Sequence, residues 1–600
     1  MVQNMLLFSR FSRTIALVLC ISLISNCSQM ATDNRQRGSQ IDNPYTMPAD
    51  AYLALAKNQQ GAEKQALLIL AAGQLIYEGQ WKQSANILAQ FNPLSEDLAK
   101  EKLLLLAKID LIREQPNAAI SKLAKINNIS TIPAYYQIQF HEMLATAYFI
   151  TKHPVESVHE RIKLENILPN EQTKTNNRLA LWMALSSLSE PEVSVLAAES
   201  PDDENMNGWV QLANISQKKF KNPQDILAHL QNWQAKFPNH PGNYILPKSQ
   251  NDLSNYLFPE PKKIALLLPI TGPISGPGNA IKDGFIAALE NSPNRYNINI
   301  QTYNTNGENI QNLYNLAIQD GAEYVVGPLT KANVSEVAKL AHPVPTLLLN
   351  DADVKPKNNA YQFGLSPANE ARQIAAKIHK KGMSRALVIA PAGTWGKDII
   401  DAFASQFRTG GGQVVETFYF SPDDDLTNSI RELLHVSAND AKRKKEKPEK
   451  GHNKPLRRED FDVIFLVAYP TQARQIVPLL KYYYAGNIPV YATSNVYSGS
   501  TNVSKDRDLN DVIFCDMPWV FSHQVGGRNW PEQFNSYNRL YAMGMDAFAL
   551  ATQLNQLLLF PAVGINNKSG IIYLNNGQEI SRILVFGKFV DGTAELRPYL

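Results

Sequence analysis

Apolar residues recur at helical spacing through residues 48–250. In residues 71–88, Ala72, Leu75 and Ile76 share one helical face, a Tyr-Glu-Gly turn follows, and Trp81 and Leu88 resume the pattern. This spacing predicts two helices joined by a short turn. The same pattern returns about 35 and then about 38 residues further on, at Ala107, Leu111, Ile120 and Leu123 and then at Ala145, Ile150 and Val158.

A period near 34 residues, with small residues where paired helices touch, resembles tetratricopeptide repeats (TPR). Pro116 and Pro154 are expected in the turns of their units. A generic helical domain without true repeats is the alternative. Either arrangement presents an extended surface suited to binding proteins or glycans, and no catalytic set of residues stands out in it. We expect a TPR-like helical domain over 48–250 and a linker over 251–260.

The pattern changes at Lys262, where short apolar runs begin to alternate with helical stretches. Runs at 264–268, 298–305, 385–393, 461–470 and 488–494 are short and flanked by helices. Such runs are typical of parallel strands buried on both faces of a sheet. The order of elements resembles the type I periplasmic-binding-protein fold. We expect a two-lobed α/β domain over 261–600, with the chain crossing between lobes near Leu365, Tyr497 and Phe560.

The first 26 residues have the character of a lipoprotein signal peptide. Arg10 and Arg13 precede an apolar run of about 12 residues, which is too short to span a bilayer comfortably. Cys27 follows in a segment that resembles a bacterial lipobox, and is the expected lipidation site; an ordinary secretory signal or membrane anchor is the alternative. Ser28 favours sorting to the outer membrane. Residues 27–47 are expected to form a lipidated, flexible tether.

Composition and charge narrow the function further. The 600 residues are 44% hydrophobic and 19% charged, as in ordinary globular proteins, and the net charge of +3 is too balanced for a nucleic-acid-coating protein. Three cysteines exclude a disulfide framework and a cysteine-rich zinc protein. We expect no cofactor and no metal site. Cys515 is expected to be a buried, unreactive side chain.

A ligand cleft between the lobes is one candidate site. Loops at the carboxyl ends of strands contact the ligand in folds of this kind. The side chains that this rule selects are Thr271, Ser275, Thr394, Trp395, Tyr469, Ser494 and Tyr497. The loop at 271–279 could hold a carboxylate, but it does not match a phosphate-binding glycine motif. A cleft packed by Trp395 or Tyr469 would disfavour a ligand.

Three short motifs of penicillin-recognising serine enzymes also occur. They are Ser216-Gln-Lys-Lys219, Ser536-Tyr-Asn538 and Lys568-Ser-Gly570. Their spacing is wrong for one active site, because the first two lie in different predicted domains. Neither HExxH nor GxSxG occurs. The sequence therefore indicates a protein that is not an enzyme.

A basic segment is predicted to form an insertion over 440–460. Residues 442–458 carry nine lysines and arginines, among them Lys442, Arg443, Lys444, Lys445, Arg457 and Arg458. A solvated loop is one interpretation. Electrostatic contact with an acidic partner, an anionic glycan or phospholipid headgroups is the other. The absence of interleaved aromatic residues argues against single-stranded nucleic acid.

The segment at 457–499 resembles one family in particular, the LpoA lipoproteins that activate class A penicillin-binding proteins at the outer membrane. Residues 391–403, 543–554 and the stretch from Trp233 to Pro241 carry the same resemblance. It implies a non-catalytic protein that docks on the periplasmic domain of a class A penicillin-binding protein and stimulates peptidoglycan cross-linking. Contact with peptidoglycan is a further expectation. The alternative is a membrane-tethered receptor for an amino acid or small anion.

Overall fold

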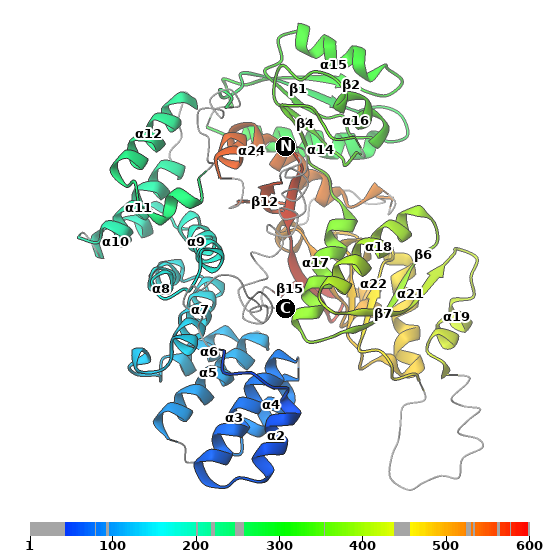
Figure 1. The fold of residues 1–600 in the computed structure, drawn as a ribbon. Helices are drawn as coiled ribbons and strands as arrows, with labels where there is room; N and C mark the ends of the chain where they lie inside the picture. The colour runs from blue at the N-terminus through cyan, green and yellow to red at the C-terminus, as the bar shows by residue number, and fades with distance from the viewer. Residues whose placement is uncertain are drawn as a thin grey trace, which may run out of the picture. The chain divides into compact units, whose positions relative to one another are not determined.

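The computed structural model describes residues 43–78, 80–91, 95–113, 115–199, 202–217, 223–246, 257–293, 295–352, 354–436, 457–523, 530–531, 534–560, 564–575 and 578–597 (Figure 1). The predicted signal peptide, Cys27 and the basic residues 442–445 lie outside them. The chain forms two compact units. The first comprises Met1–Pro259 together with Gln556–Val563, and the second comprises Glu260–Asn555 with Gly564–Pro598.

The first unit is built of helices. They run in chain order as α2 (Ala49–Lys57), α3 (Gly61–Tyr77), α4 (Trp81–Leu88), α5 (Glu96–Ile112), α6 (Pro116–Leu123), α7 (Ala134–Ile150), α8 (Pro154–Glu165), α9 (Glu171–Ser186), α10 (Glu190–Glu199), α11 (Glu204–Gln217) and α12 (Pro223–Lys236). Three long helices, α3, α5 and α7, have 17 residues each, and each is followed by a shorter helix. Their starting points are separated by the offsets seen in the sequence pattern.

Small residues at the repeated positions explain how these helix pairs pack. Ala72, Ala107 and Ala145 are fully buried, one in each long helix. The Ser84 hydroxyl donates to the Ala72 carbonyl at 2.7 Å, and the Ser157 hydroxyl donates to the Ala145 carbonyl at 2.8 Å. Pro116 and Pro154 each occupy the first turn of the short helix, where a missing N–H costs nothing. The predicted TPR-like helical fold is confirmed.

A cluster of aromatic side chains forms the core of the later helices. Trp182, Trp209 and Trp233 are all nearly inaccessible to solvent. Phe560 joins them from the far end of the sequence and stacks on Trp182, with ring centroids 5.1 Å apart and planes 22° apart. Phe560, near which a lobe crossing is expected, itself belongs to the helical unit, because its ring completes that unit's core.

The second unit contains two main sheets. The first has the order β2-β1-β3-β4-β5 and is parallel throughout. The second has the order β15-β14-β10-β9-β8-β6-β7, in which β14 and β15 run antiparallel to their neighbours. The strands are β1 (Lys263–Leu268), β2 (Asn299–Asn304), β3 (Tyr324–Val326), β4 (Thr346–Leu348), β5 (Ala360–Gln362), β6 (Arg385–Pro391), β7 (Gln413–Phe420), β8 (Val463–Leu466), β9 (Val490–Ala492), β10 (Ile513–Asp516), β14 (Val585–Val590) and β15 (Thr593–Leu596).

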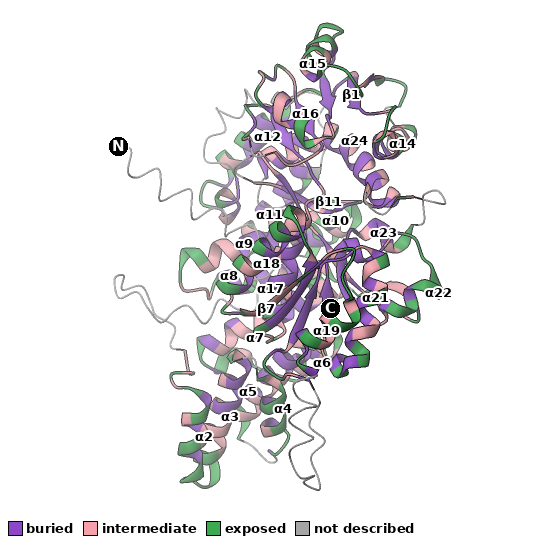
Figure 2. Cartoon of the chain, turned by 90° about the vertical axis from the view of Figure 1, so that its right-hand side faces the viewer, coloured by how far each residue is buried: buried purple, intermediate pink, exposed green. Residues whose placement is uncertain are grey.

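Helices alternate with these strands, as expected for a two-lobed α/β fold. They are α14 (Ser275–Glu290), α15 (Ile310–Gln319), α16 (Lys331–Ala338), α17 (Pro367–Lys380), α18 (Thr394–Thr409), α19 (Leu426–Leu433), α21 (Pro470–Leu480), α22 (Val503–Asp506), α23 (Pro518–Ser522) and α24 (Tyr537–Leu559). Figure 2 shows buried strands beneath helices whose outer faces are exposed. A small antiparallel sheet of β11 (Ile565–Asn567), β12 (Gly570–Leu574) and β13 (Ile580–Ile583) follows α24. We call the part around the first sheet lobe one and the part around the second sheet lobe two.

The chain passes from lobe one to lobe two between β5 and α17, in the segment that contains Leu365. The return expected near Tyr497 comes later. After that residue the chain adds β10 beside β9 in the second sheet, and it returns to lobe one only through α24. There α24 packs closely on α14, because a Cβ on Gly284 would lie 1.9 Å from the Tyr541 carbonyl oxygen and one on Gly544 would lie 2.0 Å from that of Ile281. Among the helices of the described ranges, none combines the length and apolarity needed to cross a bilayer.

Candidate functional site at the lobe crossings

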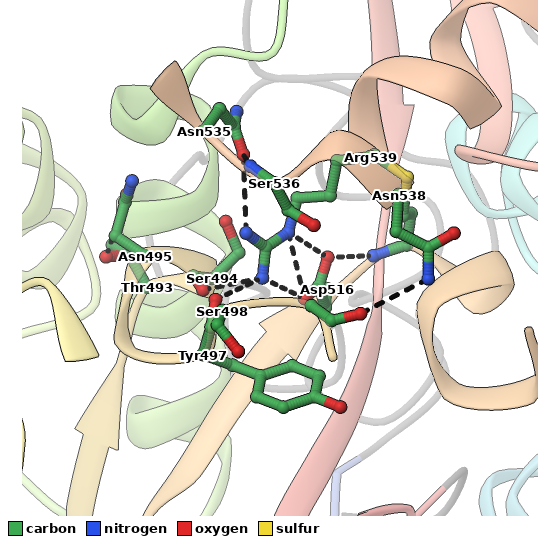
Figure 3. Close-up of polar contacts among 12 residues, drawn as sticks. Thr493, Ser494, Asn495, Tyr497, Ser498, Asp516, Asn535, Ser536, Asn538 and Arg539 are labelled. Atoms are coloured by element: carbon green, nitrogen blue, oxygen red, sulfur yellow. Dashed lines mark hydrogen bonds and ion pairs between the residues drawn. The ribbon is translucent and has the colours of Figure 1, made fainter. Parts of the chain in front are cut away.

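A cluster of buried polar residues surrounds Arg539 in the first turn of α24. Its guanidinium pairs with Asp516, with Nη2 2.6 Å from Oδ2 and Nε 2.9 Å from Oδ1 (Figure 3). Nη2 also donates to the carbonyl oxygens of Ser494 and Tyr497, at 2.8 and 2.9 Å. The two charged side chains are only 3% and 1% exposed. This is a bidentate, desolvated ion pair with further backbone acceptors.

The strand order explains why these groups meet. Asp516 ends β10, and Ser494 and Tyr497 follow β9, the adjacent parallel strand. Carboxyl ends of neighbouring parallel strands lie at one edge of a sheet. Arg539 enters this edge from the helix that carries the chain back to lobe one. The ion pair therefore ties a lobe crossing to the second sheet.

Glu370 on α17 adds a second carboxylate to this cluster. It accepts hydrogen bonds from the backbone N–H of Ser494 at 2.8 Å and from the Ser494 hydroxyl at 2.9 Å. Burial and then the nearby charge of Asp516 raise the pKa of Glu370 to about 7, although Arg582 and Arg539 oppose the rise. Burial also lowers the pKa of Arg582, against the attraction of Glu370 and Asp516. We call Glu370, Asp516, Arg539 and Arg582 the crossing cluster.

The crossing cluster is suited to holding backbone segments together rather than to catalysis. Arg539 and Asp516 neutralise each other, and Arg539 and Glu370 hold backbone atoms of the segment after β9. Removing one partner would leave a buried charge unpaired, which is strongly unfavourable. The cluster therefore favours one arrangement of the chain at the crossings.

The candidate cleft residues have separate roles in the structure. Trp395 and Tyr469, both at helix N-termini of lobe two, stack with centroids 5.1 Å apart and planes 1° apart. Ser494 and Tyr497 are buried and are bound by the crossing cluster. The Thr271 hydroxyl accepts a hydrogen bond from the Asn304 amide at 2.7 Å within lobe one.

Two further candidates begin helices. The Ser275 N–H donates to the Gly272 carbonyl at the start of α14, at 3.2 Å. Thr394 is exposed in the first turn of α18. The structure therefore brings Trp395 to Tyr469 and Ser494 to Tyr497. A ligand site that joins all seven residues stays a prediction.

The motif serines are divided between the two units. The Ser216 hydroxyl donates to the Ala213 carbonyl of its own helix, α11, in the helical unit. Ser536 and Ser569 are buried in the other unit. Cys515 is buried in the second sheet, and burial raises the pKa of its thiol well above the ordinary value. In the described parts of the chain, no group of three or more His, Cys, Asp or Glu side chains is arranged to hold a metal ion.

Of the basic candidates, Arg457 and Arg458 fall within the described residues. Arg457 donates through Nε to the Tyr484 carbonyl at 2.9 Å. Arg458 pairs with Asp460 at 2.7 Å and with Glu416. Both arginines thus fasten the end of the basic segment to lobe two. An electrostatic contact with a partner stays a prediction.

Sequence reasoning missed the crossing cluster itself. Glu370, Arg539 and Arg582 are single charges in helices or strands, and nothing local distinguishes them from exposed charges. Asp516 could have been found from the sequence, because it lies at the carboxyl end of an apolar strand. The same rule had selected Ser494, which follows the strand β9.

Comparison with known proteins covers nearly the whole chain. The family model described as "LppC putative lipoprotein" matches residues 43–592. A protein named penicillin-binding protein activator LpoA from Vibrio antiquarius (strain Ex25) is 26% identical over 562 residues, with 90% of this chain and 92% of the relative covered. The protein of the same name from Haemophilus influenzae (strain Rd) is 25% identical over 601 residues, with 97% of each chain covered.

A solved structure is also similar. The crystal structure of full-length LpoA from Haemophilus influenzae covers 93% of this chain and 99% of its own, at 23% identity and a TM-score of 0.48.

Proposed function

Because the chain belongs to the LppC lipoprotein family, we propose that it binds and stimulates a class A penicillin-binding protein and so regulates peptidoglycan synthesis and cross-linking. The observation that carries this proposal is the length of the similarity. A relative named as such an activator aligns over 97% of both chains, so it spans the helical and the α/β unit alike.

The place of action follows from the N-terminus. Cys27 would carry the lipid, and Ser28 after it favours the periplasmic face of the outer membrane. More than one acyl chain on a cysteine gives stable anchoring, whereas one chain binds only marginally. The polar residues 28–47 would act as a tether that lets the folded units reach an inner-membrane synthase through the peptidoglycan layer.

The mechanism would be allosteric rather than chemical. An activator that binds the active state of a synthase better than the inactive state shifts the population toward activity. A coupling free energy of about 1–3 kcal/mol is typical and raises the active population severalfold or more. The mutual pairing of the charges in the crossing cluster, and the position of Ser216 in a different unit from Ser536 and Ser569, support a non-catalytic role. The crossing cluster also binds Ser494 and Tyr497 through hydrogen bonds.

A pull-down followed by an activity assay tests the proposal. The chain from Ser28 onward is immobilised and exposed to detergent-solubilised membranes of its own organism, and captured proteins are identified by mass spectrometry. Enrichment of a class A penicillin-binding protein is expected. The purified synthase should then cross-link glycan faster when the chain is added.

Capture without stimulation would contradict activation. Absence of the synthase from the captured proteins, together with a thermal shift by an amino acid, would replace the proposal with a solute receptor.

A further inference from the structure

A small pocket opens on the helical unit between its three long helices. It is lined by Tyr77 from α3, by Glu101 and Lys108 from α5, by Tyr135 and Tyr136 from α7, and by Tyr45 from the segment before α2. Leu104, Leu105 and Met143 contribute apolar surface. The cavity volume is about 10 Å³, which is room for roughly one water-sized group.

Tyrosines make up most of the residues with a polar group in the pocket lining. The Tyr45 ring lies 5.4 Å from Tyr77 and 5.8 Å from Tyr135, and Tyr135 lies 5.3 Å from Tyr136, measured between centroids. The hydroxyls of Tyr77 and Tyr135 share a hydrogen bond. The Lys108 ammonium lies 4.0 Å from the centroid of Tyr77. One ring of the pocket therefore already presents its face to a cation, an arrangement that attracts positive charge.

Glu101 is the unusual group in the pocket. The residue is only 9% exposed, and its Oε1 atom has no hydrogen-bond partner among the described residues. Leaving a buried acceptor unsatisfied costs about 1–3 kcal/mol, and more when the group is charged. Burial raises the pKa of Glu101 to about 7, against a hydrogen bond from Tyr136 that lowers it. A donor that enters the pocket would relieve this cost.

Lys108 does not fill that role for Glu101. Its ammonium contacts the Gln139 side chain at 3.4 Å and the ring of Tyr77. Its charge also acts on Glu142, a half-buried residue whose pKa is raised to about 7 by desolvation while Arg161 and Lys108 oppose the rise. Lys108 is thus engaged by Gln139, Tyr77 and the charge of Glu142, whereas Oε1 of Glu101 remains an acceptor without a donor among the described residues.

We propose that this pocket binds the ammonium group of a lysine side chain contributed by a protein partner. The ammonium carries three donors, one for Oε1 of Glu101 and others for tyrosine hydroxyls. The tyrosine faces stabilise its charge, and the narrow cavity admits an unbranched chain with a compact end. Guanidinium and trimethylammonium groups are too large for one water-sized space.

A partner protein fits better than a free amino acid. The α-ammonium and α-carboxylate of a free amino acid sit on one carbon, and this end is larger than the single ammonium that a cavity of about 10 Å³ admits. Helical-repeat surfaces of this kind bind extended protein segments. The inference rests on the proposed function only for the identity of the partner. The small-molecule experiment below tests the pocket whether or not a synthase binds.

Calorimetric titration of the chain from Ser28 onward with Nα-acetyl-lysine amide tests the pocket. Binding is expected at pH 8, where Glu101 is ionised, and should weaken at least fivefold at pH 5.5, where it is protonated. The other titratable side chains that line the pocket are those of the four tyrosines and Lys108. Nε-acetylated, Nε-trimethylated and arginine analogues should bind at least tenfold more weakly. Equal binding of any of these analogues would overturn the proposal.

Variants locate the binding to Glu101. Glu101→Gln should weaken binding at least tenfold, whereas Glu96→Gln, on the same helix and exposed, should stay within twofold of the parent. Tyr136→Phe, which keeps the ring and removes the hydroxyl, should weaken binding severalfold. It tests the pocket independently if Glu101→Gln does not fold. Circular dichroism checks that each variant is folded. Unchanged binding in folded Glu101→Gln would overturn the proposal.

A last comparison identifies the source of the amine. Reductive methylation of the lysines of captured partners should abolish their recapture by the parent chain. The amount recaptured by the Glu101→Gln variant should be the same with methylated and unmethylated partners. A cell-wall peptide with a free side-chain amine that binds more tightly than Nα-acetyl-lysine amide would overturn the protein assignment.

Discussion

Truncating Phe560 to alanine should destabilise the helical unit, although the residue is encoded some 300 positions after that unit's last helix. Phe560 is 2% exposed and stacks on Trp182 within a core that includes Trp209 and Leu559. Truncating a buried phenylalanine to alanine costs about 3–5 kcal/mol, which includes the cavity left behind. An aromatic pair contributes about 0.5–1.5 kcal/mol beyond the area it buries, so the upper half of that range is expected.

Urea unfolding followed by tryptophan fluorescence measures the effect. Trp182, Trp209 and Trp233 report on the helical unit, and Trp395 and Trp519 report on the other. Hydrogen exchange resolved by peptide should show lost protection in α9 and α11. Val195→Ala, at an exposed position of α10, serves as the control and should change stability by less than about 0.5 kcal/mol.

Two results would refute this reasoning. One is an unchanged unfolding midpoint in Phe560→Ala. The other is loss of exchange protection confined to the α/β unit. The same logic predicts that a fragment ending at Pro259 is less stable than the helical unit of the whole chain, because it lacks the ring that covers Trp182.

Three further predictions concern the α/β unit. Arg539→Met leaves Asp516 buried without its partner and should cost about 3–5 kcal/mol by scanning calorimetry; the double variant with Asp516→Leu should recover at least half, and additive losses would contradict the pairing. The pKa of Glu370 in the folded state, about 7, is above the ordinary 4.5. Between these two pH values the folded state therefore binds a proton that the unfolded state has lost. The free energy of unfolding should fall as the pH rises from about 4.5 to 7, by up to about 3 kcal/mol. Glu370→Gln should flatten that part of the stability curve, and an unchanged slope would assign the effect elsewhere. In the chain from Ser28 onward Cys515 is the remaining cysteine, and it should react with a thiol reagent only at the rate of unfolding, while fast labelling of the native chain would show that the thiol is accessible.

The helical repeats could be predicted because their contacts are local. Ala72 and Ala145 each contact the helix that follows, through a serine 12 residues further on, so the spacing of small residues along the chain records the contact. The strands of the second unit were predictable for a related reason. Both faces of a parallel strand are buried, and the resulting apolar run is visible without knowing its neighbours.

The lobe crossings could be predicted only in part. The crossing near Leu365 follows a strand and precedes a helix, a change that the local pattern displays. The return was expected near Tyr497, but the short strand β10 still had to pair with β9. Whether a strand of four residues extends a sheet depends on the edge available to it, which is a property of the assembled sheet.

The helix and strand periods, the order of a helical and then an α/β part, and the resemblance to one family can all be found in the sequence, because each depends on residues close together in the chain. The folded chain alone shows which core contains Phe560, which carboxylates share a desolvated cluster with Arg539, and that Glu101 lines a pocket with four tyrosines. Each of these depends on groups far apart in the sequence, and burial changes their energies only after the chain has brought them together. The sequence alone does not distinguish a charged residue that is exposed to solvent from one that is buried in a core. Its partners and its desolvation exist only in the folded molecule.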